Sequence, residues 1–590
     1  MELPDNMTNA SPDANEEMTW AEAQRLKLRG AYFNEVNIEQ IRGWRQRCHY
    51  GHGPWCSDDH RSDLQGHLSK LILIDTRENC IVEADTSTKY IALSYVWGGV
   101  STVRLTLATK ERYMMPGALQ ITSLPHTIRD AISWTSALGE RYLWVDCLCV
   151  VQDTDAGAMN HVLQAMGHIY ATAELTIVAA NGNHANFGLP GFGQLSKSDT
   201  RGPTDDTDDS NDAMKGVIRR YWPVDSTWNS RGWTFQEALY SRRLLVFSHK
   251  HRIVWLCAHA AWTRLDHQKF AQKSFEREVN NLGWYKAKLI PMSIKSQHDF
   301  AFPKDWAIAV DAFTRRNLSF EEDFERAFAG AQHGIGSRFP GKLVHGLPQF
   351  FFDICLLWLP GRENHQKRRT KHPSWSWTGW TGKSRCKESW WPLTIYPDSL
   401  RGAQPGTLRL TAKATYTFEG CEPGMDEWLN GFYDTNYYSK SLLNNIMYSE
   451  TSSQVAFRAL RCETQIARLD LVYCGGNWQL RSNYQTIGAI LPQATERRLL
   501  RPHKELASQL VSCEVIAISQ GHVEEDPDFY GDWATLLEHA RIKGTEGFHN
   551  YYNVLWVGWE DDVAVRRGIG IVLQSAWDAL GARTVSFILG

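Results

Sequence analysis

Residues that could bind a ligand follow three short apolar segments of the sequence. They are a serine, a tryptophan and two glycines after the first segment, an aspartate after the second and an asparagine after the third: Ser94, Trp97, Gly98, Gly99, Asp146 and Asn181. Asp146 could orient a ribose hydroxyl or a catalytic water, and the Trp97 indole could stack on a base while the glycines let the backbone approach the ligand. The alternatives are structural: an aspartate that caps the next turn, and a glycine turn beside a packed indole.

The elements that must position these residues alternate between strand and helix. Tyr90–Tyr95, Tyr142–Val145 and Leu175–Ala180 are apolar runs typical of buried strands. Residues 124–138 predict a helix between the first two, and a second helical pattern, capped by Asp153 or Asp155, lies between the last two. Apolar strands that alternate with helices indicate an α/β fold with a parallel sheet covered on both faces. Ligands bind such sheets beyond the carboxyl ends of the strands, where the candidate residues lie.

The composition excludes some classes of protein and favours others. The chain has 590 residues, a formal net charge of −3, 22% charged and 43% hydrophobic residues, which is ordinary for a globular protein of several domains. Nothing in the bulk charge indicates a nucleic-acid or membrane partner. The acidic N-terminus does not resemble a signal peptide, and the longest apolar stretch, Phe350–Leu359, is too short to span a bilayer, so we expect a cytoplasmic protein.

Composition shifts along the chain suggest its domain organisation. The 25 tryptophans are concentrated in short motifs, and the segment 373–590 is rich in them and in strand-like patterns, for example at Ser374–Trp380, where Trp375 and Trp377 would share one face of a core strand. We expect a disordered N-terminus at 1–20, a helical and loop extension at 21–89, an α/β domain at 90–260 with an acidic disordered insertion at 200–216, a mainly helical region at 261–372, and a Trp-rich β/α region at 373–590.

Two groups of cysteines could do chemistry of their own. Cys147 and Cys149 follow the second apolar segment, and we interpret them as structural thiols that would share one face if that strand continued. Cysteine and histidine also gather in CHYGHGPWCSDDH, but without the paired spacing of a zinc finger. We therefore expect no metal there, and the alternative is a zinc site made by Cys48, His52, Cys56 and His60.

Five motifs in a fixed order resemble the fungal heterokaryon incompatibility domain. They are Tyr90–Gly98 (YIALSYVWG), Leu124–Ala131 (LPHTIRDA), Leu138–Asp153 (LGERYLWVDCLCVVQD), Met166–Gly182 (MGHIYATAELTIVAANG) and Arg231–Glu237 (RGWTFQE). The resemblance implies a role in non-self recognition, a form of fungal innate immunity that leads to programmed cell death when different hyphae fuse. It also implies a fold distantly similar to the flavodoxin-like TIR domain.

Some TIR domains cleave NAD with one glutamate, and others act by self-association. The resemblance places Glu237 where that glutamate stands, with Trp233 beside it in the same segment, and makes NAD a candidate substrate with no further cofactor required. The alternative is that Trp233 anchors the core and that Glu237 pairs with Arg231, Arg242 or Arg243. Two functions therefore stay open: a cell-death effector or regulator that self-associates and cleaves NAD, and a non-enzymatic scaffold that acts through oligomerisation, with itself or another signalling protein as partner.

Overall fold

The computed structural model describes the chain in a series of segments. They are residues 38–52, 56, 67–100, 103–190, 223, 225–248, 253–257, 260–263, 303–321, 323–334, 343–348, 352–361, 366–386, 410–412, 414–419, 459–474, 477–500, 511–523 and 549–590. The expected disorder at 1–20 and 200–216 lies outside these residues, as does His60.

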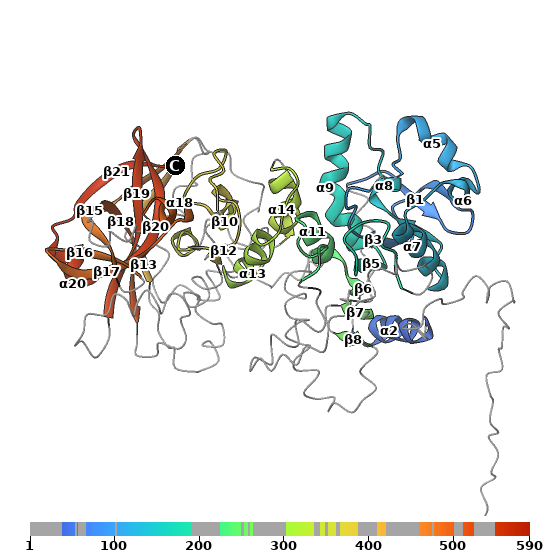
Figure 1. Cartoon of the computed structure of the whole chain (residues 1–590), viewed down its shortest axis with the longest axis horizontal. Coiled ribbons are helices and arrows are strands. Elements are labelled where there is room, and N and C mark those ends of the chain that lie inside the picture. The colour runs from blue at the N-terminus through green and yellow to red at the C-terminus, as the bar shows by residue number, and fades with distance from the viewer. Residues whose placement is uncertain are drawn as a thin grey trace, which may run out of the picture.

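An eight-stranded sheet forms the first half of the protein (Figure 1). Its spatial order is β2-β1-β4-β3-β5-β6-β7-β8. The strands are β1 (Leu71–Asp75), β2 (Cys80–Ala84), β3 (Ile91–Ser94), β4 (Tyr142–Trp144), β5 (Leu175–Ala180), β6 (Arg243–Ser248), β7 (Ile253–Cys257) and β8 (Ala261–Thr263).

The centre of this sheet is parallel, as the apolar segments predict. Four neighbouring strands, in the spatial order β4, β3, β5 and β6, pair in parallel. If these four are numbered 1 to 4 along the chain, their spatial order is 2-1-3-4. This is the order of the first four strands of a 2-1-3-4-5 sheet. It reverses between β3 and β5, the kind of position at which open α/β sheets bind ligands. The expectation of a parallel sheet is wrong for the edges, because β1, β2, β7 and β8 pair antiparallel.

Helices cover both faces of the sheet. They are α2 (Ile38–Gly51), α5 (Leu107–Met114), α6 (Ala118–Ile121), α7 (His126–Ala137), α8 (Asp146–Cys149), α9 (Ala156–Thr172) and α11 (Trp233–Tyr240). Trp134 of α7 packs on Phe247 of β6, whereas α9 and α11 lie on the face that carries Ser94 and Val178. Asp155, one of the two predicted caps, accepts hydrogen bonds from the backbone of α9 at Gly157 and Ala158.

The middle of the chain packs three helices around a tryptophan cluster. The helices are α13 (Pro303–Thr314), α14 (Asp323–Gly334) and α15 (Phe352–Cys355), beside the short pairs β9 (Leu343–Val344) with β10 (Leu347–Pro348) and β11 (Leu359–Pro360) with β12 (Ser384–Arg385). Trp375 and Trp377 are buried as predicted, and Trp380 is buried beside them, but the predicted strand is wrong. A 3-10 turn, η5 (Trp377–Gly379), replaces it, because Ser376 caps that turn and each indole donates to a backbone carbonyl.

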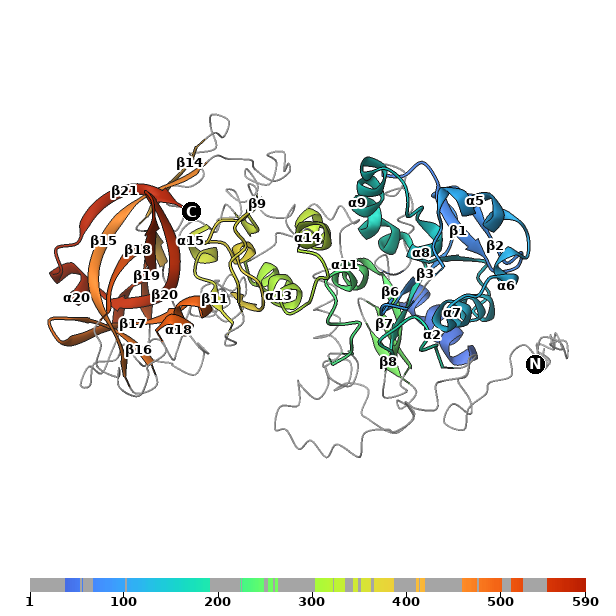
Figure 2. The same cartoon turned by 45° about the horizontal axis from the view of Figure 1, so that its top comes forward.

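A second, largely antiparallel sheet forms the C-terminal part (Figure 2). Pairings run from β15 to β18, β19, β20, β17 and β16 and back to β15, so these six strands close a barrel. The strands of this sheet are β13 (Leu410–Ala412), β14 (Thr415–Glu419), β15 (Ala459–Cys474), β16 (Asn477–Ser482), β17 (Gln485–Pro492), β18 (Val511–Val523), β19 (His549–Glu560), β20 (Val563–Leu573) and β21 (Arg583–Leu589). Helices α18 (Ala494–Leu499) and α20 (Gln574–Ala579) lie beside it.

A buried arginine of the barrel hydrogen-bonds to the middle segment, the described residues between 303 and 386. Arg566 of β20 donates to the carbonyls of Leu356 (2.8 Å) and Trp358 (2.5 Å), and its guanidinium lies 3.9 Å from the centroid of the Trp358 ring. One hydrophobic cluster accordingly extends from α2 through the middle helices to the barrel. Among the residues described, no helix combines the length and the apolar character needed to cross a membrane.

Candidate active site

The parallel pairing brings the predicted ligand residues to one edge of the sheet. Ser94 is the last residue of β3, Asp146 begins α8 just after β4, and Asn181 follows β5. Ser94 and Asn181 are buried, and Asp146 is half-buried. The sequence pattern therefore places its chemistry-bearing side chains at the carboxyl ends of the central strands.

Glu237 joins this edge from helix α11. The Ser94 hydroxyl donates to Glu237 Oε2, and the Trp228 indole donates to Ser94 Oγ over 2.6 Å. Thr234 Oγ1, in the first turn of α11, donates to the carbonyls of Trp228 (2.6 Å) and Arg231 (2.9 Å), which holds the loop against the helix. Trp228, Ser94 and Glu237 thus form a chain of two hydrogen bonds, from the indole N–H to the hydroxyl and from the hydroxyl to the carboxyl group.

Burial controls the protonation of this carboxyl group. Glu237 is 7% exposed, and desolvation raises its pKa to about 7, although the hydrogen bond from Ser94 opposes that rise. The nearby Asp146 carboxyl raises the pKa of Glu237 further, whereas Arg231 and the Tyr170 hydroxyl lower it. Burial also raises the pKa of Asp146. Two carboxyl groups thus share one poorly solvated site, a feature that functional sites often have.

Asp146 is held by two donors. The indole of Trp97 donates to Asp146 Oδ2 over 2.8 Å, and the backbone N–H of Cys147 donates to Oδ1 over 2.7 Å. The guanidinium of Arg104 lies 5.3 Å from the centroid of the Trp97 ring. Trp97 therefore uses its polar edge to orient Asp146, while one face of its indole is close to an arginine.

The two glycines after Trp97 differ in their surroundings. Both have positive φ, 69° at Gly98 and 68° at Gly99. A Cβ at Gly98 would lie 2.3 Å from His184 Cβ and 2.5 Å from the carbonyl oxygen of Asn183, whereas a Cβ at Gly99 would meet open space. The close approach at Gly98 is thus to the loop after β5, which Asn181 braces by donating to the Gly188 carbonyl over 2.9 Å.

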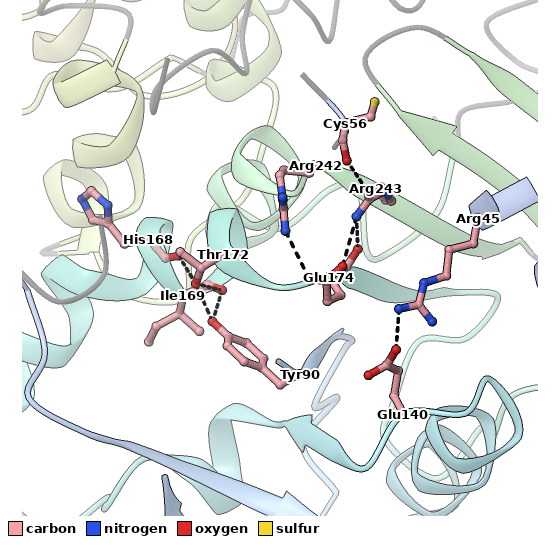
Figure 3. A network of polar contacts seen from close by, with 10 residues as sticks. All are labelled: Arg45, Cys56, Tyr90, Glu140, His168, Ile169, Thr172, Glu174, Arg242 and Arg243. Carbon is pink, nitrogen blue, oxygen red and sulfur yellow. Dashed lines mark hydrogen bonds and ion pairs between the residues drawn. The ribbon is translucent and has the colours of Figure 1, made fainter. Parts of the chain in front are cut away.

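Trp233 and the paired arginines lie elsewhere. The Trp233 indole points to helix α14, where it donates to Asp323 over 3.3 Å. Arg242 and Arg243 both pair with Glu174, at the amino end of β5, with N···O distances of 3.9 and 3.4 Å (Figure 3). Of the three arginine partners that the sequence suggests for Glu237, Arg231 lowers its pKa electrostatically, whereas Arg242 and Arg243 pair with Glu174.

Three residues of the site have no clear signal in the sequence. They are Trp228, which bonds Ser94; Tyr170 of α9, whose hydroxyl donates to the Leu93 carbonyl over 3.1 Å; and Arg316. Arg316 follows α13 and donates to the Arg231 carbonyl (3.1 Å), to Thr234 Oγ1 (2.9 Å) and to Asn229 Oδ1 (3.0 Å). Burial lowers the pKa of Arg316 to about 9, and Glu237 opposes that change.

Arg316 also lines a hollow of about 560 Å³ between the middle helices and the segment 366–386. The hollow is basic, since Arg315, Arg369 and Lys383 line it with Arg316, and Glu321 is the acidic residue among its lining groups. Arg316 therefore connects this basic hollow with the surroundings of Glu237, whose charge affects the pKa of Arg316.

The cysteines divide into two groups. Cys147 and Cys149 lie in the short helix α8, so the strand does not continue through them. Both are buried, and burial raises the pKa of Cys149 to about 12. Such thiols are poor nucleophiles. Cys48, His52 and Cys56 do come together, and Cys257 joins them.

Comparison with known proteins gave one finding for this region. Residues 90–237 match the family model described as Heterokaryon incompatibility protein (HET), which identifies a HET domain there. The search of curated proteins and the search of solved structures gave no match.

Proposed function

We propose, from the HET domain at residues 90–237, that this protein serves heterokaryon incompatibility as a cytoplasmic cell-death effector that cleaves NAD once it self-associates. The domain supports the role in incompatibility, and the geometry around Glu237 supports the chemistry. The partner in this proposal is a second copy of the chain or another incompatibility protein.

The main observation in favour of NAD cleavage is the position of Glu237 beside Ser94, at the point where the strand order reverses. Cleavage of the bond between nicotinamide and ribose passes through an oxocarbenium-like state, which a nearby carboxylate stabilises. A pKa of about 7 gives Glu237 both protonation states near neutral pH. Asp146 would orient a ribose hydroxyl or the attacking water.

The basic hollow at Arg316 supports a nucleotide as the substrate. Arg315 and Lys383 would accept the pyrophosphate of NAD, because guanidinium and ammonium groups pair well with phosphate oxygens, whereas Arg369 is paired with Glu321 and Arg316 donates to protein groups. The substrate would then extend from that hollow toward Glu237, along the side chain of Arg316.

The site is closed in the single chain, which gives self-association its role. Glu237 is 7% exposed and bonded to Ser94, so α11 or the loop at 228–231 has to shift before NAD can reach the carboxylate. Assembly would supply the free energy for that shift, because a partner that binds the open form stabilises it.

The test is release of nicotinamide from NAD by the purified full chain, measured by chromatography in dilute and in crowded, assembled samples. We expect release in the assembled sample, and loss of release in Glu237→Gln. Asp130→Asn is the matched control, because Asp130 is a buried carboxyl group of the same domain that accepts a hydrogen bond from Leu189 instead. Release that is unchanged in Glu237→Gln would refute the assignment.

A specific observation also favours the non-enzymatic alternative. The bonds of Glu237 to Ser94 and of Ser94 to Trp228 satisfy a buried carboxyl group, which is what a purely structural role requires. In that case assembled wild-type protein releases no nicotinamide, yet Glu237→Gln still kills cells as the wild type does.

A further inference from the structure

A cluster of three cysteines and one histidine lies away from the candidate active site. The ligand atoms of Cys48, His52, Cys56 and Cys257 all lie within 4.8 Å of one another. His52 Nδ1 is 3.3 Å from Cys257 Sγ and 3.9 Å from Cys56 Sγ. In a tetrahedral zinc site, Zn–S distances of about 2.3 Å place two sulfurs about 3.8 Å apart and a sulfur and a nitrogen about 3.5 Å apart. The cluster has the dimensions of such a site.

Two distant parts of the sequence build the cluster. Cys48 lies in the last turn of α2, His52 and Cys56 follow at intervals of four residues, and Cys257 is the last residue of β7. His52 comes directly after α2 ends at Gly51, and its ring nitrogen lies within 4.8 Å of the Cys48 sulfur. Helix α2 packs against β7, which carries Cys257 to that face.

A buried arginine holds the third cysteine in place. Arg243, which is opposite Cys257 in the β6–β7 register, donates to the backbone carbonyl of Cys56. The Cys56 sulfur points away from Arg243 (Figure 3). The same arginine pairs with Glu174, so Cys56 is tied to the amino ends of β5 and β6.

The surroundings of the cluster fit bound thiolates. The backbone N–H of Ala260 donates to Cys257 Sγ over 3.2 Å, the kind of outer contact that orients a metal ligand. The His52 ring lies 5.4 Å from the Trp262 ring, and all three cysteines are buried and outside disulfides. An imidazole nitrogen among three buried sulfurs is a ligand set suited to Zn²⁺.

We propose that Cys48, His52, Cys56 and Cys257 bind one structural Zn²⁺ ion that fastens helix α2 and the residues after it to strand β7. Four protein ligands fill a tetrahedral site, which leaves no position for a substrate. The zinc site lies at the amino edge of the parallel strands, opposite the edge that carries Glu237.

The proposal is tested on the full chain, purified under reducing conditions without chelator and without a metal-binding tag. Elemental analysis should find close to one zinc ion per chain. Protein stripped of metal and given Co²⁺ should show the visible absorption of tetrahedral cobalt and a thiolate-to-cobalt charge-transfer band. Metal removal should also lower the melting temperature, because binding free energy contributes to folding.

Two cysteine variants test whether zinc binding depends on the cluster and not on buried cysteines in general. Cys257→Ser should lower the zinc affinity by at least the roughly 10–100-fold that loss of an outer contact costs. Cys80→Ser is the matched control, since Cys80 is equally buried in β2 but outside the cluster, and it should keep its zinc. Wild-type protein that carries far less than one zinc and takes up neither Zn²⁺ nor Co²⁺ would overturn the proposal, as would a disulfide between two of the three cysteines or an octahedral cobalt spectrum.

Discussion

The buried carboxyl group of Glu237 makes the stability of the α/β domain depend on pH in a predictable direction. Its pKa rises from the usual 4.5 to about 7, chiefly through burial. Between these values the folded chain keeps a proton that the unfolded chain has released, so stability falls as pH rises from about 4.5 to about 7. Each pH unit in that interval corresponds to about 1.4 kcal/mol, which gives a loss of about 3 kcal/mol.

The substitution Glu237→Gln removes this loss. The glutamine oxygen can still accept the hydrogen bond from Ser94, but the amide does not ionise. We therefore expect Glu237→Gln to be near the wild type in stability at pH 5 and more stable than the wild type by about 3 kcal/mol at pH 9. For a domain of about 150–250 residues that difference is worth roughly 6–12 °C in melting temperature.

The assay compares melting temperatures of wild type and variant by intrinsic fluorescence from pH 5 to pH 9. Asp75→Asn is the control, because the pKa of this buried carboxyl group is lowered and not raised. Burial would raise the pKa of Asp75, but hydrogen bonds from Arg141 and from the backbone outweigh burial and lower it, so its substitution should destabilise by the same amount throughout this range. A constant difference between wild type and Glu237→Gln from pH 5 to pH 9 would refute the reasoning about Glu237.

Three further predictions concern packing and hydrogen bonds. Ser94→Ala removes the hydrogen-bond partner of both the Trp228 indole and the Glu237 carboxyl group. Unfolding measurements should show that the free energy of unfolding falls by about 1–3 kcal/mol for each group that loses its partner. Ser133→Ala, on the surface of α7, is the control and should change the free energy of unfolding by less than about 0.5 kcal/mol. Gly98→Ala should lower the melting temperature more than Gly99→Ala, because both have positive φ but only the first meets a clash; equal losses would contradict the tight contact with residues 183–184. Arg566→Lys should loosen the barrel from the middle segment, seen as faster hydrogen exchange at 352–361, since lysine cannot serve both carbonyls and stack on Trp358; unchanged exchange would argue against this fastening.

The sequence predicted the centre of the sheet well because that part depends on local patterns. Strand β5 has the predicted limits, Leu175–Ala180, and Asp155 caps α9 as its spacing suggested. Two further expectations concerned long-range geometry: that Ser94 and Asp146 lie at one edge of the sheet, and that Glu237 lies beside them. The first follows from parallel strands, whose carboxyl ends meet, and the second from the family resemblance, because Glu237 comes from helix α11 and not from a strand.

Other features depend on tertiary pairings that a single sequence does not reveal. Cys257 joins Cys48 only because β7 pairs antiparallel with β6 and α2 packs on β7. In the sequence it lies 201 positions beyond Cys56, the nearest of the other three ligand residues. Arg316 reaches the carbonyl of Arg231 from another helix pair altogether. The alternating Trp375 and Trp377 resemble a strand in sequence, but the capping hydroxyl of Ser376 and the indole hydrogen bonds favour a turn.

The sheet extends beyond the family match on both sides, and this matters for how the domain can be prepared. The match ends at Glu237, inside α11, whereas β6 pairs along the whole of β5 and β1 pairs with β4. An expression fragment cut at 90 and 237 would leave β4 and β5 as bare edges, which invite aggregation. A fragment from about Ile38 to Thr263 would retain every strand of the sheet together with Cys48 and Cys257.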